Sequence, residues 1–335
     1  MVNTGYRQTL YFGDESNYGS AATIDQPIGL VQSVNPTETN NLMQIRTLGG
    51  SRDYSNIVPG TFEVSGSFEY YLQGAAFLRQ AIGEDTATTT TVDSCLNFHS
   101  GAHPYLHVMG SASSPTADEF PSFSLELADT EDDGTSADTK NLYRLYKGCR
   151  VNSLTISGDT DNPVTVSADW IAQSVSAGSA AATSVTESTV DPYVFYNGVV
   201  YATSGTIGAY DTVEADSRMC TVNSFDFTVN NNLESNWYVA GTCAPEENIR
   251  GLKSLIPMGR EYEASLEVHF QNKTQYERFL GAVGASSPQK TLDKYQIVLD
   301  FVRSGAIGGT KATDDDWMRI VLEDTAFDSM NIDGS

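Results

Sequence analysis

The sequence predicts a fold dominated by β-strands, a β-rich α+β protein built from two homologous domains in tandem. The main observation is an internal repeat: Ile57–Gln73 reads IVPGTFEVSGSFEYYLQ, and Leu255–Gln271 reads LIPMGREYEASLEVHFQ. Both copies place Pro and Gly before a run in which apolar and polar residues alternate, and such alternation is typical of half-buried strands. A repeat within one chain indicates that the same structural unit occurs twice.

Two further similarities keep the same order in both copies. An Asn-rich segment precedes each strand, and an alternating segment with an upstream arginine follows it. The paired segments are Thr39–Leu42 with Asn230–Leu233, and Arg144 plus Asn152–Gly158 with Arg319 plus Asp328–Gly334. Within the strands, Glu63 aligns with Glu263 when two extra residues in the second copy are allowed for.

The repeat divides the chain into residues 1–175 and 189–335, each of ordinary domain size. Residues 176–188 are the predicted linker, because this stretch is composed largely of Ser, Ala, Gly and Thr without periodicity. With 335 residues and 40% hydrophobic side chains, the chain is long and apolar enough for two cores.

Each copy is predicted to contain a strand followed by one amphipathic helix. The strand at Phe62–Leu72 has one apolar face and one acidic face, since successive strand side chains point to opposite sides. The pattern then changes to a helical period over Gln73–Ile82 and over Thr274–Val283. Each predicted helix stops at a glycine, Gly83 or Gly284, and packs on its sheet.

The remaining predicted strands show the same alternation. They are Phe123–Leu127, Leu142–Tyr146, Ser153–Ser157 and Val164–Trp170 in the first copy, and Tyr295–Val302 and Met318–Leu322 in the second. Glu84–Ser94 and Asp129–Lys140 are predicted loops. The second copy ends where the first continues into Val164–Trp170, so we expect an unpaired edge at Met330–Asp333 that a neighbouring subunit covers.

The acidic composition restricts the classes of partner. The chain has 43 acidic and 19 basic residues, a formal net charge of −24. Stable binding to a nucleic-acid backbone needs clustered Lys and Arg, so the composition argues against it, whereas an acidic wall suits DNA that slides past without sticking. Acidic residues in excess with few lysines are also typical of proteins adapted to high salt, and a halophilic source is compatible with any function.

No catalytic, nucleotide-binding or metal-binding motif occurs, which predicts a non-enzymatic protein without cofactor or metal. His99, His103 and His107 follow Cys95 at helical spacing, but an intervening glycine and proline would break the helix that metal binding needs. Asp129–Lys140 resembles a calcium loop but has Lys at its twelfth position, where a bidentate Glu is required. The four cysteines are widely spaced, so buried free thiols are expected instead of a zinc site or disulfides.

No secretory signal and no apolar run of about 20 residues is present, so a soluble protein made in the cytoplasm and independent of membranes is expected.

Several segments share their pattern with one family of proteins. They are Asn232-Leu233, the region of Gly241, Leu255–Glu263 leading into a strand and a Tyr-x-x-Phe-Leu helix, and Tyr146–Ile156. In these segments the chain resembles the tail tube, or major tail, proteins of long-tailed viruses.

The resemblance implies two tandem tail-tube-like β-sandwich or half-barrel domains, each with one flanking helix. Their inner sheets would join between subunits around a lumen lined by acidic residues. A duplicated domain implies trimeric rings with pseudo-sixfold symmetry, stacked into a tail tube that serves as a conduit for DNA ejection. The positions expected to line the lumen are Glu63, Glu69, Glu261, Glu263 and Glu267. The same residues are compatible with the solvent side of an antiparallel sheet.

The resemblance further implies a structural virion protein, synthesised and assembled in the host cytoplasm. Its expected partners are copies of itself and other tail proteins, namely the tape measure, the terminator and the baseplate or tip. DNA would pass through without specific binding. Two alternatives remain open from the sequence: a tail hub or distal tail protein, and a tandem β-sandwich surface or adhesion protein, which the lack of a signal sequence disfavours.

Overall fold

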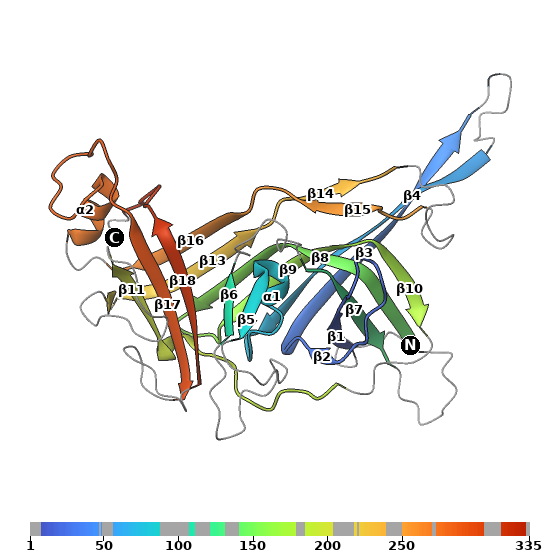
Figure 1. Cartoon of the computed structure of the whole chain (residues 1–335), viewed down its shortest axis with the longest axis horizontal. Helices are drawn as coiled ribbons and strands as arrows, with labels where there is room; N and C mark the ends of the chain where they lie inside the picture. The colour runs from blue at the N-terminus through green and yellow to red at the C-terminus, as the bar shows by residue number, and fades with distance from the viewer. Residues whose placement is uncertain are drawn as a thin grey trace.

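The computed structural model describes most of the chain, in the following ranges: residues 8–46, 48, 56–87, 107–110, 121–130, 141–178, 185–203, 218–219, 221–238, 250–269, 273–304 and 316–332. Antiparallel strands dominate these ranges, with two short helices and one 3-10 turn (Figure 1). The predicted β-dominated fold is confirmed. We refer to the described residues up to 178 as the first half and to those from 185 onward as the second half.

Strand β8 (Leu142–Asp159) connects two layers of sheet, because it is long enough to take part in both. Its first part pairs with β7 (Phe123–Asp129) and β10 (Ser174–Gly178). Its second part pairs with β9 (Thr165–Ala172) and β13 (Val222–Asn230). The second half of the chain is thereby joined to the first by a continuous ladder of backbone hydrogen bonds.

The second layer, which we call the six-stranded sheet, contains strands from both halves. Its order is β3 (Leu30–Ile45), β4 (Asn56–Tyr71), β9, β8, β13 and β16 (Glu261–Val268), and all neighbours are antiparallel. Figure 1 shows the ends of β3 and β4 projecting beyond the body of the protein. Next to them, β14 (Leu233–Asn236) and β15 (Ser254–Pro257) form a shorter hairpin that continues β13 and β16.

The other layer repeats between the halves. In the first half the order is β2 (Gln26–Pro27), β1 (Gln8–Asp14), β7 and β8. In the second half the order is β12 (Arg218–Met219), β11 (Gly198–Thr203), β17 (Tyr295–Ser304) and β18 (Asp316–Thr325). The two sheets therefore use strands in corresponding positions along the chain.

Aromatic side chains fill the space between the layers. Phe77, which follows β4, lies 5.3 Å from both Phe12 of β1 and Phe123 of β7, and 5.0 Å from Phe68 of β4, measured between ring centroids. In the second half Phe225 of β13 lies 5.1 Å from Phe301 of β17. Each cluster contains rings from the six-stranded sheet and from the other layer, so both halves have a core of the sandwich type.

Several element boundaries differ from the sequence-based expectations. The helices are shorter than predicted: α1 spans Arg79–Ile82 and α2 spans Thr274–Leu280, and α2 stops at Gly281, not at Gly284. The cause at α2 is Glu277, which forms an ion pair with Lys273 at 2.6 Å and accepts a hydrogen bond from the Gly284 amide at 2.9 Å. The carboxylate thus holds the chain in a turn after the helix.

Two predicted loops and two predicted strands also change. Glu84–Ala87 forms β5, which pairs with β6 (His107–Gly110), so the predicted loop Glu84–Ser94 is wrong at its start. Asp129 is the last residue of β7, so the loop predicted to begin at Asp129 cannot begin before Thr130. The separate strands predicted at Leu142–Tyr146 and Ser153–Ser157 are one strand, β8. Cys95, His99, His103 and most of Asp129–Lys140 lie outside the described residues.

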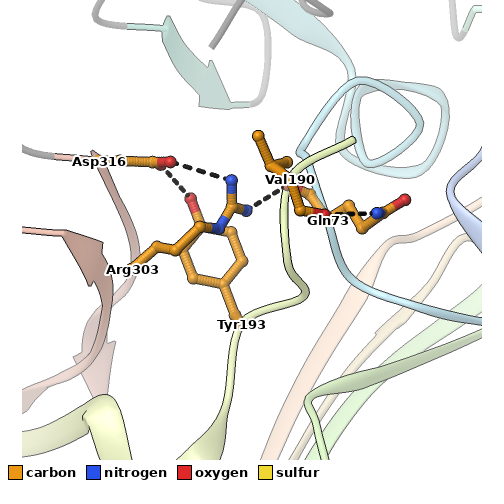
Figure 2. A network of polar contacts seen from close by, with 5 residues as sticks. All are labelled: Gln73, Val190, Tyr193, Arg303 and Asp316. Carbon is orange, nitrogen blue, oxygen red and sulfur yellow. Dashed lines mark hydrogen bonds and ion pairs between the residues drawn. The ribbon is translucent and has the colours of Figure 1, made fainter. Parts of the chain in front are cut away.

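A polar network fixes the segment between the halves (Figure 2). Asp316 of β18 accepts hydrogen bonds from the Tyr193 hydroxyl at 3.0 Å and from Arg303 of β17 at 2.9 Å. Arg303 also donates to the Gln73 carbonyl and lies 4.3 Å from the centre of the Tyr193 ring. Gln73 in turn donates to the Val190 carbonyl at 2.6 Å. Burial, together with the Asp316 carboxylate, raises the pKa of Tyr193, which therefore stays neutral and donates.

Candidate functional site

One face of the six-stranded sheet carries polar and acidic side chains from strands of both halves, and we call it the polar face. Residues directly opposite each other in neighbouring antiparallel strands have side chains on the same face. One such row crosses all six strands: Ser33, Glu69, Ser167, Thr155, Thr228 and Glu263. Glu69 of the first half and Glu263 of the second half therefore lie in one row on one face.

The adjacent rows place the other predicted glutamates on the same side. The next row along the sheet is Asn35, Ser67, Asp169, Ser153, Asn230 and Glu261. Glu63 lies opposite Thr39, two positions from Ser65 and thus on the face of Glu69, and Glu267 lies opposite Ser224. All five glutamates predicted from the sequence are exposed and share the polar face.

Three further carboxylates of the polar face were not predicted. Asp169 is in β9, Asp159 ends β8, and Asp226 is in β13, and all three are exposed. For Asp226 the sequence contained a local signal of an exposed strand position, since this residue lies between the apolar residues Phe225 and Phe227. Their common location depends on the pairing of β8 with β9 and β13, which local alternation does not specify.

In the four central strands of this sheet, β4, β9, β8 and β13, the opposite face is apolar and buried, whereas in the edge strands β3 and β16 it is largely exposed. Phe68 in β4, Ile156 in β8, Trp170 in β9 and Phe227 in β13 are at most 3% exposed. Strict alternation therefore turns one face toward the core and leaves the other in solvent, where its carboxylates keep their hydration.

Neutral donors orient several of the carboxylates. Ser153 donates to Asp169 at 2.8 Å and Ser224 donates to Glu267 at 3.2 Å, in each case across neighbouring strands. Asn41 donates to Glu63 at 2.9 Å. Because hydroxyl and amide groups carry no net charge, these contacts fix the side chains and leave the negative charge uncompensated.

Asp159 is held in its ionised form by its own turn. Its carboxylate accepts hydrogen bonds from the Asn162 side chain and from the backbone amides of Asp161 and Asn162, each at 3.0 Å. These bonds favour the charged state, and the side-chain bond from Asn162 is the largest cause of the lowered pKa of Asp159. Asp159, Glu69 and Asp226 border a hollow of about 410 Å³ on the polar face.

Positive charge is scarce on this face. Among the described residues that strand pairing places on the polar face, Arg150 is the only arginine. It lies opposite Ile171 near the end of β9. Arg150 donates to the Leu255 carbonyl and lies 4.8 Å from the centre of the Tyr18 ring, so its charge is directed to contacts within the chain. No group of His, Cys, Asp and Glu able to hold a metal ion occurs within the described ranges.

The chain belongs to the phage tail tube protein family, whose model matches residues 5–326. The resemblance to the tail tube proteins that the sequence indicated is confirmed. No curated protein matches the chain. Membership makes this a structural protein of the tail tube and a component of the virion, which assembles with itself and with other tail proteins. In the part of the chain that the structure describes, no helix has the length and hydropathy to cross a membrane.

Proposed function

We propose that three copies of this chain close into a ring, that rings stack into a tube, and that the polar face lines the lumen through which DNA is ejected. The observation that carries the proposal is the polar face itself. It runs without interruption across strands of both halves, it carries exposed carboxylates in every strand except β3, and its reverse side is core behind the four central strands. A sheet of this kind suits a wall between a wet channel and a packed protein shell.

The number of chains follows from the proposed duplication. We infer two homologous units, residues 1–175 and 189–335 joined by residues 176–188, and the matching strand orders of the two halves support it. The first three residues of the proposed connecting segment, 176–178, belong to β10 and pair with β8. If each unit contributes one sixth of a ring, three chains complete it with pseudo-sixfold symmetry.

The proposed lumen acts on DNA by repulsion. DNA phosphates approach carboxylates that neutral donors hold in place, so no position along the path offers the clustered cations that would trap the duplex. The lumen residues of this proposal are the five predicted glutamates, with Asp159, Asp169 and Asp226. The same electrostatics requires no cofactor, metal or catalytic group.

Assembly at high ionic strength is the expected counterpart of this charge. With a net charge of −24 per chain, copies repel one another. Salt screens this repulsion beyond a distance of about 8 Å at 0.15 M, and this distance becomes shorter as the salt concentration rises. We propose a halophilic setting on this basis. The tape measure, the terminator and the baseplate or tip are the proposed partners beyond the tube, and assembly is proposed to take place in the host cytoplasm.

Electron microscopy of the purified protein across a salt series tests the ring. The expected result is stacked rings at high salt, with threefold symmetry at high resolution and the polar face toward the axis. Monodisperse single chains at every salt concentration would contradict the proposal. A single ring that never stacks would instead support a tail hub or distal protein.

Charge reversal tests the lumen separately. Virions that carry Glu261→Lys, Glu263→Lys and Glu267→Lys together should release DNA more slowly than the parent, because three cations now attract phosphates along the path. Asp293→Lys is the matched control, since Asp293 is exposed but lies after α2, away from the polar face. Equal release rates for the parent and the triple variant would remove the electrostatic part of the proposal.

A further inference from the structure

We propose that residues 326–332 form a strand that adds to the free edge of β3 in a second copy of the chain, with Ser329 opposite Asn41 and Asn331 opposite Thr39. The inference rests on the proposed ring and specifies how its subunits join. Three observations lead to it: a bulge that the two halves share, an alternating segment left without partners, and the junction of β8 with β13 inside the chain.

The first observation is an equivalent bulge in β8 and β18. In the first half the pairing shifts between Phe123–Cys149 and Leu125–Tyr146. In the second half it shifts between Tyr295–Thr325 and Ile297–Leu322. In both cases two residues of the fourth strand are left between the pairs against one residue of the third, so Cys149 corresponds to Thr325.

The backbone conformation inside the two bulges also agrees. Gly148 has φ of 64° and Asp324 has φ of 55°, and these residues occupy the same place in their bulges. Left-handed backbone is uncommon outside glycine, so its recurrence at Asp324 indicates that the same bend is needed there. In the first half this bend directs β8 from one sheet layer into the six-stranded sheet.

The second observation concerns the chain after the bend. From Arg150 onward β8 continues as a strand, whereas residues 326–332 have no strand pairing in the isolated chain. By the bulge alignment, Met330 and Ile332 correspond to Leu154 and Ile156. Those two core residues are fully buried, but Ile332 is 63% exposed. Alternation of Ser329, Met330, Asn331 and Ile332 is typical of a half-buried strand, so the segment has the pattern of β8 without its neighbours.

The third observation identifies the acceptor. Inside the chain, the corresponding part of β8 pairs with β13, with Ser153 opposite Asn230 and Thr155 opposite Thr228. The counterpart of β13 in the first half is β3, because Glu63 lies opposite Thr39 as Glu263 lies opposite Thr228. Strand β3 is the terminal strand of the sheet order, and in the described part of the chain it pairs with β4 alone.

The register follows by transferring the internal junction to the edge of β3. Ser329 and Asn331 take the places of Ser153 and Thr155, and Asn41 and Thr39 take those of Asn230 and Thr228. Their side chains then continue the polar face, while Met330 and Ile332 point toward the core side. The ladder ends before Pro36, because proline has no N–H to donate to a neighbouring strand.

Disulfide trapping in assembled rings tests this register. The variant Thr39→Cys/Asn331→Cys places two thiols directly opposite each other across the proposed junction, where the Cβ separation suits a disulfide. After mild oxidation of rings, we expect covalent dimers and trimers on non-reducing gels. The matched control is Glu38→Cys/Asn331→Cys, because Glu38 and Asn331 would lie on opposite faces of the sheet. The single variants control for the native cysteines.

A second double variant tests the alternative in which β16 contacts β3 directly. Thr39→Cys/Glu263→Cys would form disulfides between copies only in that arrangement. Two results would overturn the proposed strand addition: disulfides from Thr39→Cys/Glu263→Cys, or no more disulfide from Thr39→Cys/Asn331→Cys than from its control. Neither result would contradict the proposed tube. Absence of rings from the unmodified protein would overturn the proposed function as well.

Discussion

Strands β3 and β13 occupy corresponding positions in the two halves but differ in their surroundings. In β13, Phe225, Phe227 and Val229 are at most 3% exposed, because β8 covers one edge and β16 the other. Among the described residues, strand β3 pairs with β4 alone, and most of its residues are exposed. The two strands also differ in sequence, because β3 has Pro36, Glu38 and Asn40 where β13 has Phe225, Phe227 and Val229. The comparison shows that position in the sheet and residue type together set the exposure of β3.

The largest expected effect is on the covered strand. Phe225→Ala should lower the free energy of unfolding by about 3–5 kcal/mol, because it removes a ring packed against Phe301 and leaves a cavity. Pro36→Ala is the matched change at the corresponding place in β3 and should alter stability by about 1 kcal/mol or less. Denaturant unfolding of single chains at low salt measures both, and equal losses would break the comparison.

The next effect concerns the junction that holds the halves together. Arg303→Met removes the partner of the buried Asp316 carboxylate and should cost about 3 kcal/mol, since breaking a buried pair leaves an uncompensated charge. Lys294→Met is the control, because the Lys294–Asp324 pair is largely exposed and such pairs contribute about 0–1 kcal/mol. Thermal unfolding of both variants measures the difference, and a loss for Arg303→Met no greater than that for Lys294→Met would show that the network does not join the halves.

Substitutions in residues 326–332 are expected to reduce ring assembly and to have little effect on the stability of the single chain. Met330→Asp with Ile332→Asp should change the stability of the isolated chain by about 1 kcal/mol or less, because Ile332 is exposed there and Met330 is only half-buried. The same variant should lose rings, since two charges would have to enter the core side of the junction. Sedimentation at high salt measures the loss, and Val283→Asp with Leu292→Asp serves as control, because these two exposed apolar residues lie outside the proposed ladder. Normal ring formation by the double variant would contradict the strand addition.

The smallest effect is confined to the polar face. Asn162→Ala removes the main hydrogen bond that lowers the pKa of Asp159, so this pKa should rise toward its ordinary value of 3.8. Because the folded-state pKa is lowered, the contribution of Asp159 to stability is present above pH 3.8 and is lost as the pH falls through the folded-state pKa. Carboxyl resonances followed by NMR across an acid titration measure the change, and an unchanged midpoint would show that the turn does not orient this carboxylate.

The sequence predicted the alternating strands and the exposed acidic side of two of them correctly, because side-chain direction along a strand is a local property. The place of the five glutamates in a lumen stays a prediction. It misaligned one residue: through the bulges Arg144 corresponds to Ile320, although Arg144 pairs with Asp129 and Arg319 with Asp300. The bulge occurs in both halves and does not cause this shift; sequence matching paired the two arginines by residue type, one position away from the correspondence that the strand pairing defines. The end predicted for the first helix, Gly83, is confirmed, whereas the end predicted for the second, Gly284, is wrong. Glu277 and the Gly284 amide interact through a turn after α2 that periodicity does not describe.

The amino-acid sequence by itself determined that strands dominate, that a unit recurs in the same order, and that one side of the strands at Phe62–Leu72 and Glu261–Val268 is acidic. Only the tertiary structure decided that β8 serves both halves, that Asp159, Asp169 and Asp226 join the glutamates on one face, and that β3 keeps a free edge. The physical reason is that alternation assigns each side chain to a face, whereas hydrogen-bond partners between strands come from residues far apart in the chain. Those partners are selected by the packing of the whole core.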